Sequence, residues 1–158
     1  MLNKNEATAK AWLKDHEIDK THLWPFQIEA ITAIEKAILS RKRHMMVAMA
    51  TGTGKTFTIF NLIYRLMKSG YAKRILFLVD RRALAAQAVT TAASFEAEPG
   101  LKFDQCYEVY SQRIRREDLD EDMKFDPKIL PSEYLTNPNI RHSFVYISTI
   151  QRMRINLF

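Results

Sequence analysis

The sequence predicts an α/β fold in which a mainly parallel sheet is covered by helices on both faces. Three observations support this prediction. Apolar runs of strand length recur along the chain, stretches with helical periodicity lie between them, and the order is strand, helix, strand, helix. With 158 residues, of which 47% are hydrophobic and 27% charged, the chain is long enough for one domain with a sizeable core.

The predicted elements follow one another closely in the first part of the chain. Isoleucines at three- and four-residue steps, with charged residues between them, indicate an amphipathic helix at 27–39. The apolar run at 45–50 predicts a buried strand, and 57–68 predicts a helix that is apolar on most sides. A second buried strand and its following helix are predicted at 74–80 and 83–95.

The stretch from 98 to 142 differs in character, because it holds four of the five prolines and an acidic cluster at 117–122. We expect one short strand within 103–111 and otherwise a long, irregular excursion over the surface. Cys106 belongs to this strand and is expected to pack there, since a single cysteine builds neither a disulfide framework nor a metal site. A last buried strand is predicted at 143–149, and the sequence stops soon after it, so we expect a piece of a longer protein.

Charge and composition narrow the choice of partner and location. The net charge of +6 and the pI of about 9.5 favour a polyanionic partner. Basic residues gather at 41–44, directly before the first predicted strand. The chain has no apolar stretch of about 18 residues and its first residues are polar, so we expect no membrane span and no signal peptide, and a cytoplasmic location.

The most informative feature is the segment 49–56 (Met-Ala-Thr-Gly-Thr-Gly-Lys-Thr), which lies between a predicted strand and a predicted helix. Gly52 and Gly54 can adopt backbone angles that turn consecutive N–H groups toward one anion, and the helix N-terminus adds its positive dipole end. Lys55 would reach the β- and γ-phosphates of a nucleoside triphosphate, and the Thr56 hydroxyl would bind Mg²⁺. The predicted phosphate-binding residues are Thr51, Gly52, Thr53, Gly54, Lys55 and Thr56, with Lys55 and Thr56 in the catalytic roles.

The general phosphate-loop pattern begins with Gly at the position that Met49 holds here. An apolar residue at this position, followed closely by Thr-Gly-Thr-Gly-Lys-Thr, resembles motif I of the superfamily 2 helicases and translocases. Upstream, 23–31 (Leu-Trp-Pro-Phe-Gln-Ile-Glu-Ala-Ile) looks like the Leu-x-Pro-Tyr-Gln-x-x-Ala segment of these motors. The resemblance implies that ATP is the cofactor, with Mg²⁺, and that the Gln27 amide holds the adenine edge, which offers a matching donor and acceptor.

Two segments downstream resemble motifs that contact the nucleic-acid backbone in the same motors. Residues 77–87 look like motif Ia, and 148–153 are similar to a further motif at the end of a later strand. The resemblance implies duplex DNA as a partner, contacted through its backbone. The implied DNA-binding residues are Arg81, Arg82, Thr149 and Arg152. The alternative for the arginines is ordinary solvated surface charge beside a sheet.

The motor of the R (restriction) subunit of type I restriction enzymes resembles this chain in the amino-acid sequence of three segments, 48–56, 74–82 and 145–153. The related type III res subunits share this resemblance. This implies a three-layer, recombinase-A-like phosphate-loop NTPase domain over 23–158, with the insertion at about 98–142 and a helical lead-in at 1–22. It also implies an ATP-dependent DNA translocase that works with modification and specificity subunits.

The family's Asp-Glu-x-His box, which binds Mg²⁺ and positions the attacking water, does not occur in the sequence. The acidic cluster does not replace it, because no apolar strand precedes the cluster. We therefore expect a motor domain truncated before this box, which binds ATP but does not hydrolyse it by itself. Two alternatives stay open, a small-molecule kinase of the phosphate-loop type and a non-hydrolysing module that binds ATP or nucleic acid.

Overall fold

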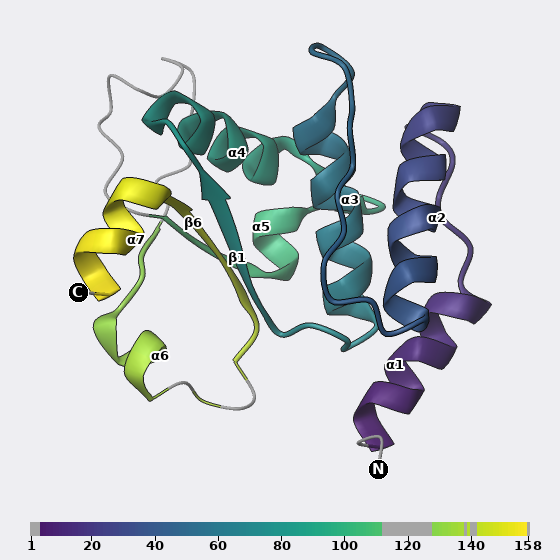
Figure 1. Ribbon diagram of the computed structural model, residues 1–158, viewed down its shortest axis with the longest axis horizontal. Helices are drawn as coiled ribbons and strands as arrows, with labels where there is room; N and C mark the ends of the chain where they lie inside the picture. The colour runs from purple at the N-terminus through teal and green to yellow at the C-terminus, as the bar shows by residue number, and fades with distance from the viewer. Residues whose placement is uncertain (1–3, 112–127, 138, 140–141, 158) are drawn as a thin grey trace. The chain divides into compact units, whose positions relative to one another are not determined.

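A computed structural model describes residues 4–111, 128–137, 139 and 142–157 of the chain (Figure 1). The chain divides into two compact units, Met1–Ala72 and Lys73–Phe158, called here the N-terminal and the C-terminal unit. The predicted acidic cluster at 117–122 lies outside the described residues. Among the helices of the described part, none combines the length and the apolar character needed to cross a membrane.

The N-terminal unit is built from α1 (Lys4–Asp15), α2 (Pro25–Leu39) and α3 (Lys55–Lys68). Pro25 occupies the first turn of α2, where its missing N–H group costs no hydrogen bond. Helices α2 and α3 lie side by side and begin at the same end of the pair (Figure 1). Both predicted helices of this region, at 27–39 and 57–68, are thus confirmed, with α3 starting two residues earlier than expected.

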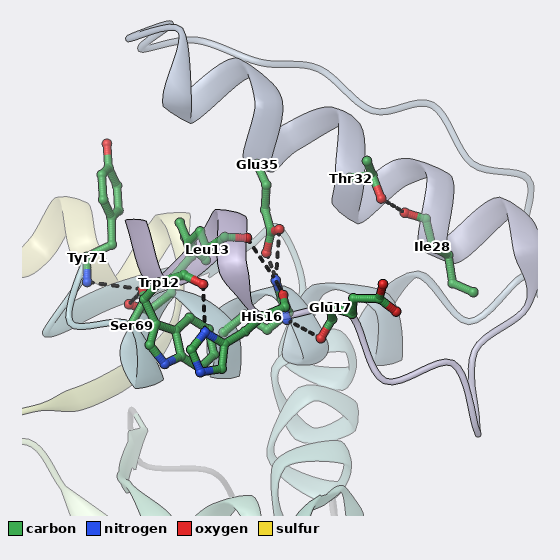
Figure 2. A network of polar contacts seen from close by, with 11 residues as sticks. Trp12, Leu13, His16, Glu17, Ile28, Thr32, Glu35, Ser69 and Tyr71 are labelled. Atoms are coloured by element: carbon green, nitrogen blue, oxygen red, sulfur yellow. Dashed lines mark hydrogen bonds and ion pairs between the residues drawn. The ribbon is translucent and has the colours of Figure 1, made fainter. Parts of the chain in front are cut away.

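A buried ion pair joins the three helices of the N-terminal unit (Figure 2). Arg65 of α3 donates to Glu35 of α2 through Nε at 2.6 Å and through Nη2 at 3.1 Å. The same guanidinium donates to the carbonyl oxygens of His16 at 2.7 Å and Glu17 at 2.9 Å, just past the end of α1. Charge-assisted hydrogen bonds of this kind are strong where water is excluded, so they fix how the helices pack.

The predicted strand at 45–50 is wrong. These residues form no strand in the structure, and their side chains are largely exposed, Met46 to 94%. Methionine and alanine favour helices over pleated strands, so this run has little local preference for a sheet.

The C-terminal unit contains the sheet. Its elements are β1 (Arg74–Val79), α4 (Arg82–Ser94), β2 (Glu96–Glu98), β3 (Leu101–Lys102), α5 (Phe103–Cys106), β4 (Glu108–Ser111), β5 (Lys128–Ile129), α6 (Ser132–Thr136), β6 (Phe144–Thr149) and α7 (Ile150–Leu157). The four-stranded sheet has the order β1-β6-β4-β5, and every pairing in it is parallel. β2 and β3 form a separate antiparallel pair. The predicted α/β class with a mainly parallel sheet is confirmed.

Strand β6 is the centre of this unit, because every one of its residues is buried. Phe144 and Tyr146 pack in an aromatic cluster that also receives Tyr134 of α6 and Met153 of α7. The alternate residues point to the opposite face of the sheet, which α4 covers. Burial on both faces explains why the first four residues of β6 are all apolar.

The strand predicted within 103–111 is only partly correct. Phe103–Cys106 forms the short helix α5, and the strand β4 begins at Glu108. Cys106 therefore lies on a helix and not in a strand, and its thiol is in no disulfide and of intermediate exposure. Phe103 is fully buried and packs against Phe95, with ring centroids 6.2 Å apart, so an apolar contact decides the local structure here.

Candidate functional site

The loop between residues 50 and 55 has the backbone that a phosphate cradle requires. Gly52 and Gly54 both adopt left-handed conformations, with φ of 79° and 72°, which other residues reach only at a cost. The Thr53 hydroxyl donates to the carbonyl oxygen of Ala50 at 2.7 Å and closes the turn. The sequence-predicted turn thus forms although the strand predicted before it does not.

Helix α3 starts at Lys55 directly after this loop, with Gly54 as its N-cap. No side chain of the described residues caps this helix end. The N–H groups of a first helical turn have no partner within the helix, so here they remain available to a ligand. Together with the helix dipole, they would favour an anion at this end of α3.

The two predicted catalytic residues occupy the first turn of α3. The Lys55 ammonium folds back over the loop, 2.9 Å from the carbonyl oxygen of Ala50 and 3.4 Å from that of Met49. It is exposed, and within the described residues no carboxylate pairs with it. Its charge is therefore free to meet a phosphate. Thr56 follows as the second residue of the helix and is half-buried.

Gln27 reaches the same loop from α2 and is only 3% exposed. Its Nε2 donates to the Thr53 carbonyl oxygen at 3.0 Å, and its Oε1 accepts from the backbone N–H of Trp24 at 3.0 Å. A Cβ atom on Gly54 would lie 2.7 Å from this Nε2, so only glycine fits at that position. Gln27 thereby holds the loop itself through one of its two amide N–H donors.

The predicted DNA contacts lie in the C-terminal unit, at one end of two neighbouring parallel strands. Val79 of β1 pairs in register with Thr149 of β6, so the residues after both strands emerge at the same edge of the sheet. Arg81, Arg82 and Arg152 are exposed there. In open α/β sheets, ligands bind outside these carboxyl ends of the strands.

Thr149 is placed differently from the three arginines. It is only 5% exposed, and its hydroxyl accepts from the backbone N–H of Arg152 at 3.4 Å, at the start of α7. Arg81 has a partner at 3.6 Å in the neighbouring Asp80, but this pair is solvent-exposed and therefore weak. The edge thus offers arginine side chains to a polyanion, while Thr149 acts on the helix that carries one of them.

Mg²⁺ is compatible with the cradle as a ligand that arrives with the nucleotide. The described residues hold no group of three or more His, Cys, Asp or Glu side chains that could bind a metal by themselves. Mg²⁺ commonly keeps several waters and binds to phosphate oxygens and few protein groups. The Thr56 hydroxyl would supply one such group.

The sequence interpretation missed the Glu35–Arg65 pair. A signal was present, because Glu35 falls between Ile31 and Ile38 in the apolar stripe of α2, and Arg65 follows Leu62 on the buried face of α3. Opposite charges inside the apolar faces of two consecutive helices indicate a buried ion pair.

Residues 20–157 match the family described as type III restriction enzyme, res subunit. The chain is 42% identical over 90 residues to the type I restriction enzyme EcoKI endonuclease subunit of Escherichia coli strain K12. The matched stretch covers 56% of this chain and 8% of that protein. For the EcoAI endonuclease subunit of Escherichia coli, the identity is 37% over 90 residues, 54% of this chain and 11% of the relative. The chain is also 41% identical to the UvrABC system protein B of Mycoplasma mycoides subsp. mycoides SC over 61 residues. This stretch covers 39% of this chain and 8% of that protein.

The chain therefore spans about a tenth of the length of these curated relatives. No solved structure matches it. The predicted kinship with the motors of type I and type III restriction enzymes is confirmed.

Proposed function

This chain belongs to the family of the type III restriction enzyme res subunit, and we propose that it is the ATP-binding first motor domain of an ATP-dependent DNA translocase. The observation that carries the proposal is the uncapped start of α3, which follows two left-handed glycines and carries Lys55 in its first turn. The relatives named as endonuclease subunits of type I restriction enzymes support the R subunit as the whole protein. In that setting, modification and specificity subunits would be its partners.

In the proposed mechanism the chain's own residues bind and orient the nucleotide. The first-turn N–H groups of α3 and the Lys55 ammonium would hold the phosphates, and the Gln27 amide would bind the adenine edge. Because Gln27 also holds the Thr53 carbonyl, occupation of the base position would be coupled to the shape of this loop. The Thr56 hydroxyl would hold Mg²⁺, and the ion would supply charge neutralisation at the transferred phosphoryl group.

The ATP-binding part is tested by titration calorimetry of Mg·ATP into the intact chain and into Lys55→Ala. A charge-assisted contact to phosphate contributes ~1.5–3 kcal/mol, so the affinity should fall by about 10- to 150-fold. Lys36→Ala is the matched control, since Lys36 is an exposed lysine on α2 of the same unit. If Lys55→Ala binds as tightly as this control, the phosphate-cradle assignment is wrong.

The DNA-binding part rests on the arginines at the sheet edge. We propose that Arg81, Arg82 and Arg152 contact phosphates and not bases, with Thr149 acting as support for α7. Binding should then be indifferent to sequence and should weaken with salt, with each lost contact lowering the log–log salt slope by about 0.9. If the log–log salt slope stays the same when Arg81 and Arg82 are both replaced by Ala, these arginines do not contact DNA and are ordinary solvated charges on the surface.

The sequence favours one further candidate, a module that binds ATP or nucleic acid without hydrolysis, because it contains no Asp-Glu-x-His box. Both candidates expect this chain by itself to bind ATP without turnover, because its residues contain no Asp-Glu-x-His box to bind Mg²⁺ and position the attacking water. Joining the chain to a motor segment that carries this box distinguishes them. Phosphate release by the completed protein, abolished by Lys55→Ala, supports the translocase.

A further inference from the structure

A basic pocket lies in the N-terminal unit, at the opposite end of α2 from the phosphate loop. It holds about 700 Å³ and is lined by residues of α1, by the end of α2 and by the chain that follows α2. Its charged lining residues are Lys10, Arg41, Lys42, Arg43 and Glu6. The 15 residues of α2 place it roughly 22 Å from the Gln27 end of the helix.

The pocket carries a net positive charge that the described residues do not neutralise. Among the described residues that line it, Glu6 is the only carboxylate, and it is paired with Lys10 at 2.9 Å. Arg41, Lys42 and Arg43 are exposed, and their side chains make no hydrogen bond or ion pair with any residue that the structure describes. Three uncompensated cations around one hollow favour an anionic ligand.

The backbone at Arg41 supports a role for its side chain. Helix α2 ends with hydrogen bonds from Arg41 N–H to the Ile38 carbonyl and from Lys42 N–H to the Ala37 carbonyl, at 2.9 Å each. This ending places Arg41 in the left-handed region, with φ of 61°, where glycine is the usual residue. An arginine there is strained, and retained strain is a reason to look for function.

We propose that this pocket is a second nucleic-acid contact, separate from the sheet-edge arginines, and that it takes phosphodiester groups of a DNA backbone. Three exposed cations around one hollow suit a polyanion that carries a phosphate on every nucleotide, which a DNA backbone does. The site extends the proposed DNA-binding function but uses different residues, in the other unit.

The rival explanation is that these cations complement the negative end of the α2 dipole. Arg41→Gly separates the two explanations. Glycine relieves the left-handed strain, so the melting temperature should rise, whereas the affinity for DNA should fall. If the cation served only the helix end, its removal would lower the melting temperature and leave DNA binding unchanged.

The main test is fluorescence anisotropy of the full chain with two unrelated labelled duplexes across a salt series. The triple variant Arg41→Gly, Lys42→Ala and Arg43→Ala should lower the log–log salt slope by up to about 2.7, or about 0.9 for each contact. The matched control is Lys14→Ala, Lys20→Ala and Lys36→Ala, which removes the same charge from exposed positions of the same unit. Equal losses in both triple variants would overturn the proposal.

A second arm separates a DNA backbone from a free phosphate compound. Tripolyphosphate is titrated calorimetrically in the Lys55→Ala background, so that the phosphate loop does not contribute. Tripolyphosphate binding that requires Arg41–Arg43, together with duplex binding that does not, would overturn the assignment to DNA. The variant with Arg81 and Arg82 both replaced by Ala tests the sheet edge separately. It should lower the log–log salt slope of duplex binding whether or not the pocket residues are replaced, so a failure of the pocket proposal can be told from a failure of the proposed DNA contact at the sheet edge.

Discussion

Residues 45–50 and 144–149 are both segments of strand length in which most residues are apolar, and the structure treats them in opposite ways. The second run forms β6, in which every residue is buried between β1 and β4. The first run forms no strand, and Met46 is almost fully exposed. The wholly apolar segment is the one that forms no strand, so length and apolar character do not decide between a strand and an irregular segment.

Two differences separate the runs. β6 is rich in aromatic and β-branched residues, which suit a pleated surface, whereas 45–50 consists of Met and Ala apart from Val47. β6 also has a hydrogen-bonded neighbour on each side. A strand forms only when partners satisfy its backbone groups, and an apolar run by itself does not provide them.

The two units also differ in what holds them together. The N-terminal unit is joined by the Glu35–Arg65 pair and its hydrogen bonds to the end of α1. The C-terminal unit is joined by apolar burial on both faces of β6. Both tryptophans, Trp12 and Trp24, lie in the N-terminal unit, so tryptophan fluorescence follows that unit and near-ultraviolet circular dichroism of the tyrosine cluster follows the other.

The largest expected effect tests the contrast between the two apolar runs. Ile147→Asp places a carboxylate at a position with no exposed surface, so the free energy of unfolding should fall by on the order of 5 kcal/mol, enough to unfold the C-terminal unit. Met46→Asp, at the exposed run, should change it by less than about 0.5 kcal/mol. Thermal melts followed by circular dichroism measure both. A comparable loss in Met46→Asp would mean that 45–50 is buried in solution.

The next effect concerns the ion pair of the N-terminal unit. Glu35→Ala leaves the Arg65 charge buried and unpaired, which should cost about 3–5 kcal/mol in urea unfolding followed by tryptophan fluorescence. The double variant Glu35→Leu with Arg65→Met replaces the pair by apolar groups. It should recover most of the loss, because the cost comes from the unpaired charge. If the double variant were as unstable as Glu35→Ala, the loss of stability would instead come from the hydrogen bonds that Arg65 donates to the carbonyl oxygens at the end of α1.

A smaller effect distinguishes two left-handed glycines, one in each unit. Gly54→Ala meets both the strained φ and the Gln27 amide at 2.7 Å, so it should cost about 2–3 kcal/mol and weaken ATP binding. At Gly100, with φ of 75°, nothing lies within 4 Å, so Gly100→Ala should cost only about 1–2 kcal/mol and leave ATP binding intact. Chemical denaturation and calorimetry give the two quantities. Equal costs at the two glycines would show that Gln27 moves aside freely.

The smallest effect is a pH dependence of the C-terminal unit. Burial raises the pKa of Glu108, but hydrogen bonds from Tyr110 and His142 outweigh it and hold the pKa below the ordinary value of 4.5. A carboxyl whose pKa is lowered on folding stabilises the protein above its unfolded pKa and loses that contribution as the pH falls through the folded value. Glu108 is more than a third exposed, so the contribution should stay below about 1 kcal/mol.

Glu108→Gln should therefore flatten the stability profile below about pH 4.5, while Glu133→Gln, at an exposed position on α6, should not. Melting temperatures across an acid pH series measure the difference. Identical profiles for the two variants would remove Glu108 as the source.

Much of the molecule was predictable because local pattern and local chemistry agree. The helices α2, α3 and α4 and the strands β1 and β6 follow from periodicity and apolar runs. The turn at Gly52 and Gly54 follows from the angles that only glycine reaches without strain. The edge position of Arg81 and Arg152 follows from their place directly after parallel strands.

Other features depended on contacts between residues far apart in the chain. Phe103 packs into a core and turns a strand-like segment into α5, and Thr149 is buried under the start of α7. Gln27 donates to the Thr53 carbonyl, in the predicted phosphate loop, from a position 26 residues earlier in the chain. No local pattern specifies such pairings, because their energies depend on which groups burial brings together.

The sequence by itself determined the α/β class, the family and the turn at Gly52 and Gly54, because each follows from short-range periodicity or from a motif whose backbone angles select glycine. Only the tertiary structure decided which apolar run becomes a strand, which charges are buried as a pair and which remain free around the basic pocket. The physical reason is that backbone partners and desolvation are properties of neighbours in space, which the order of residues along the chain does not contain.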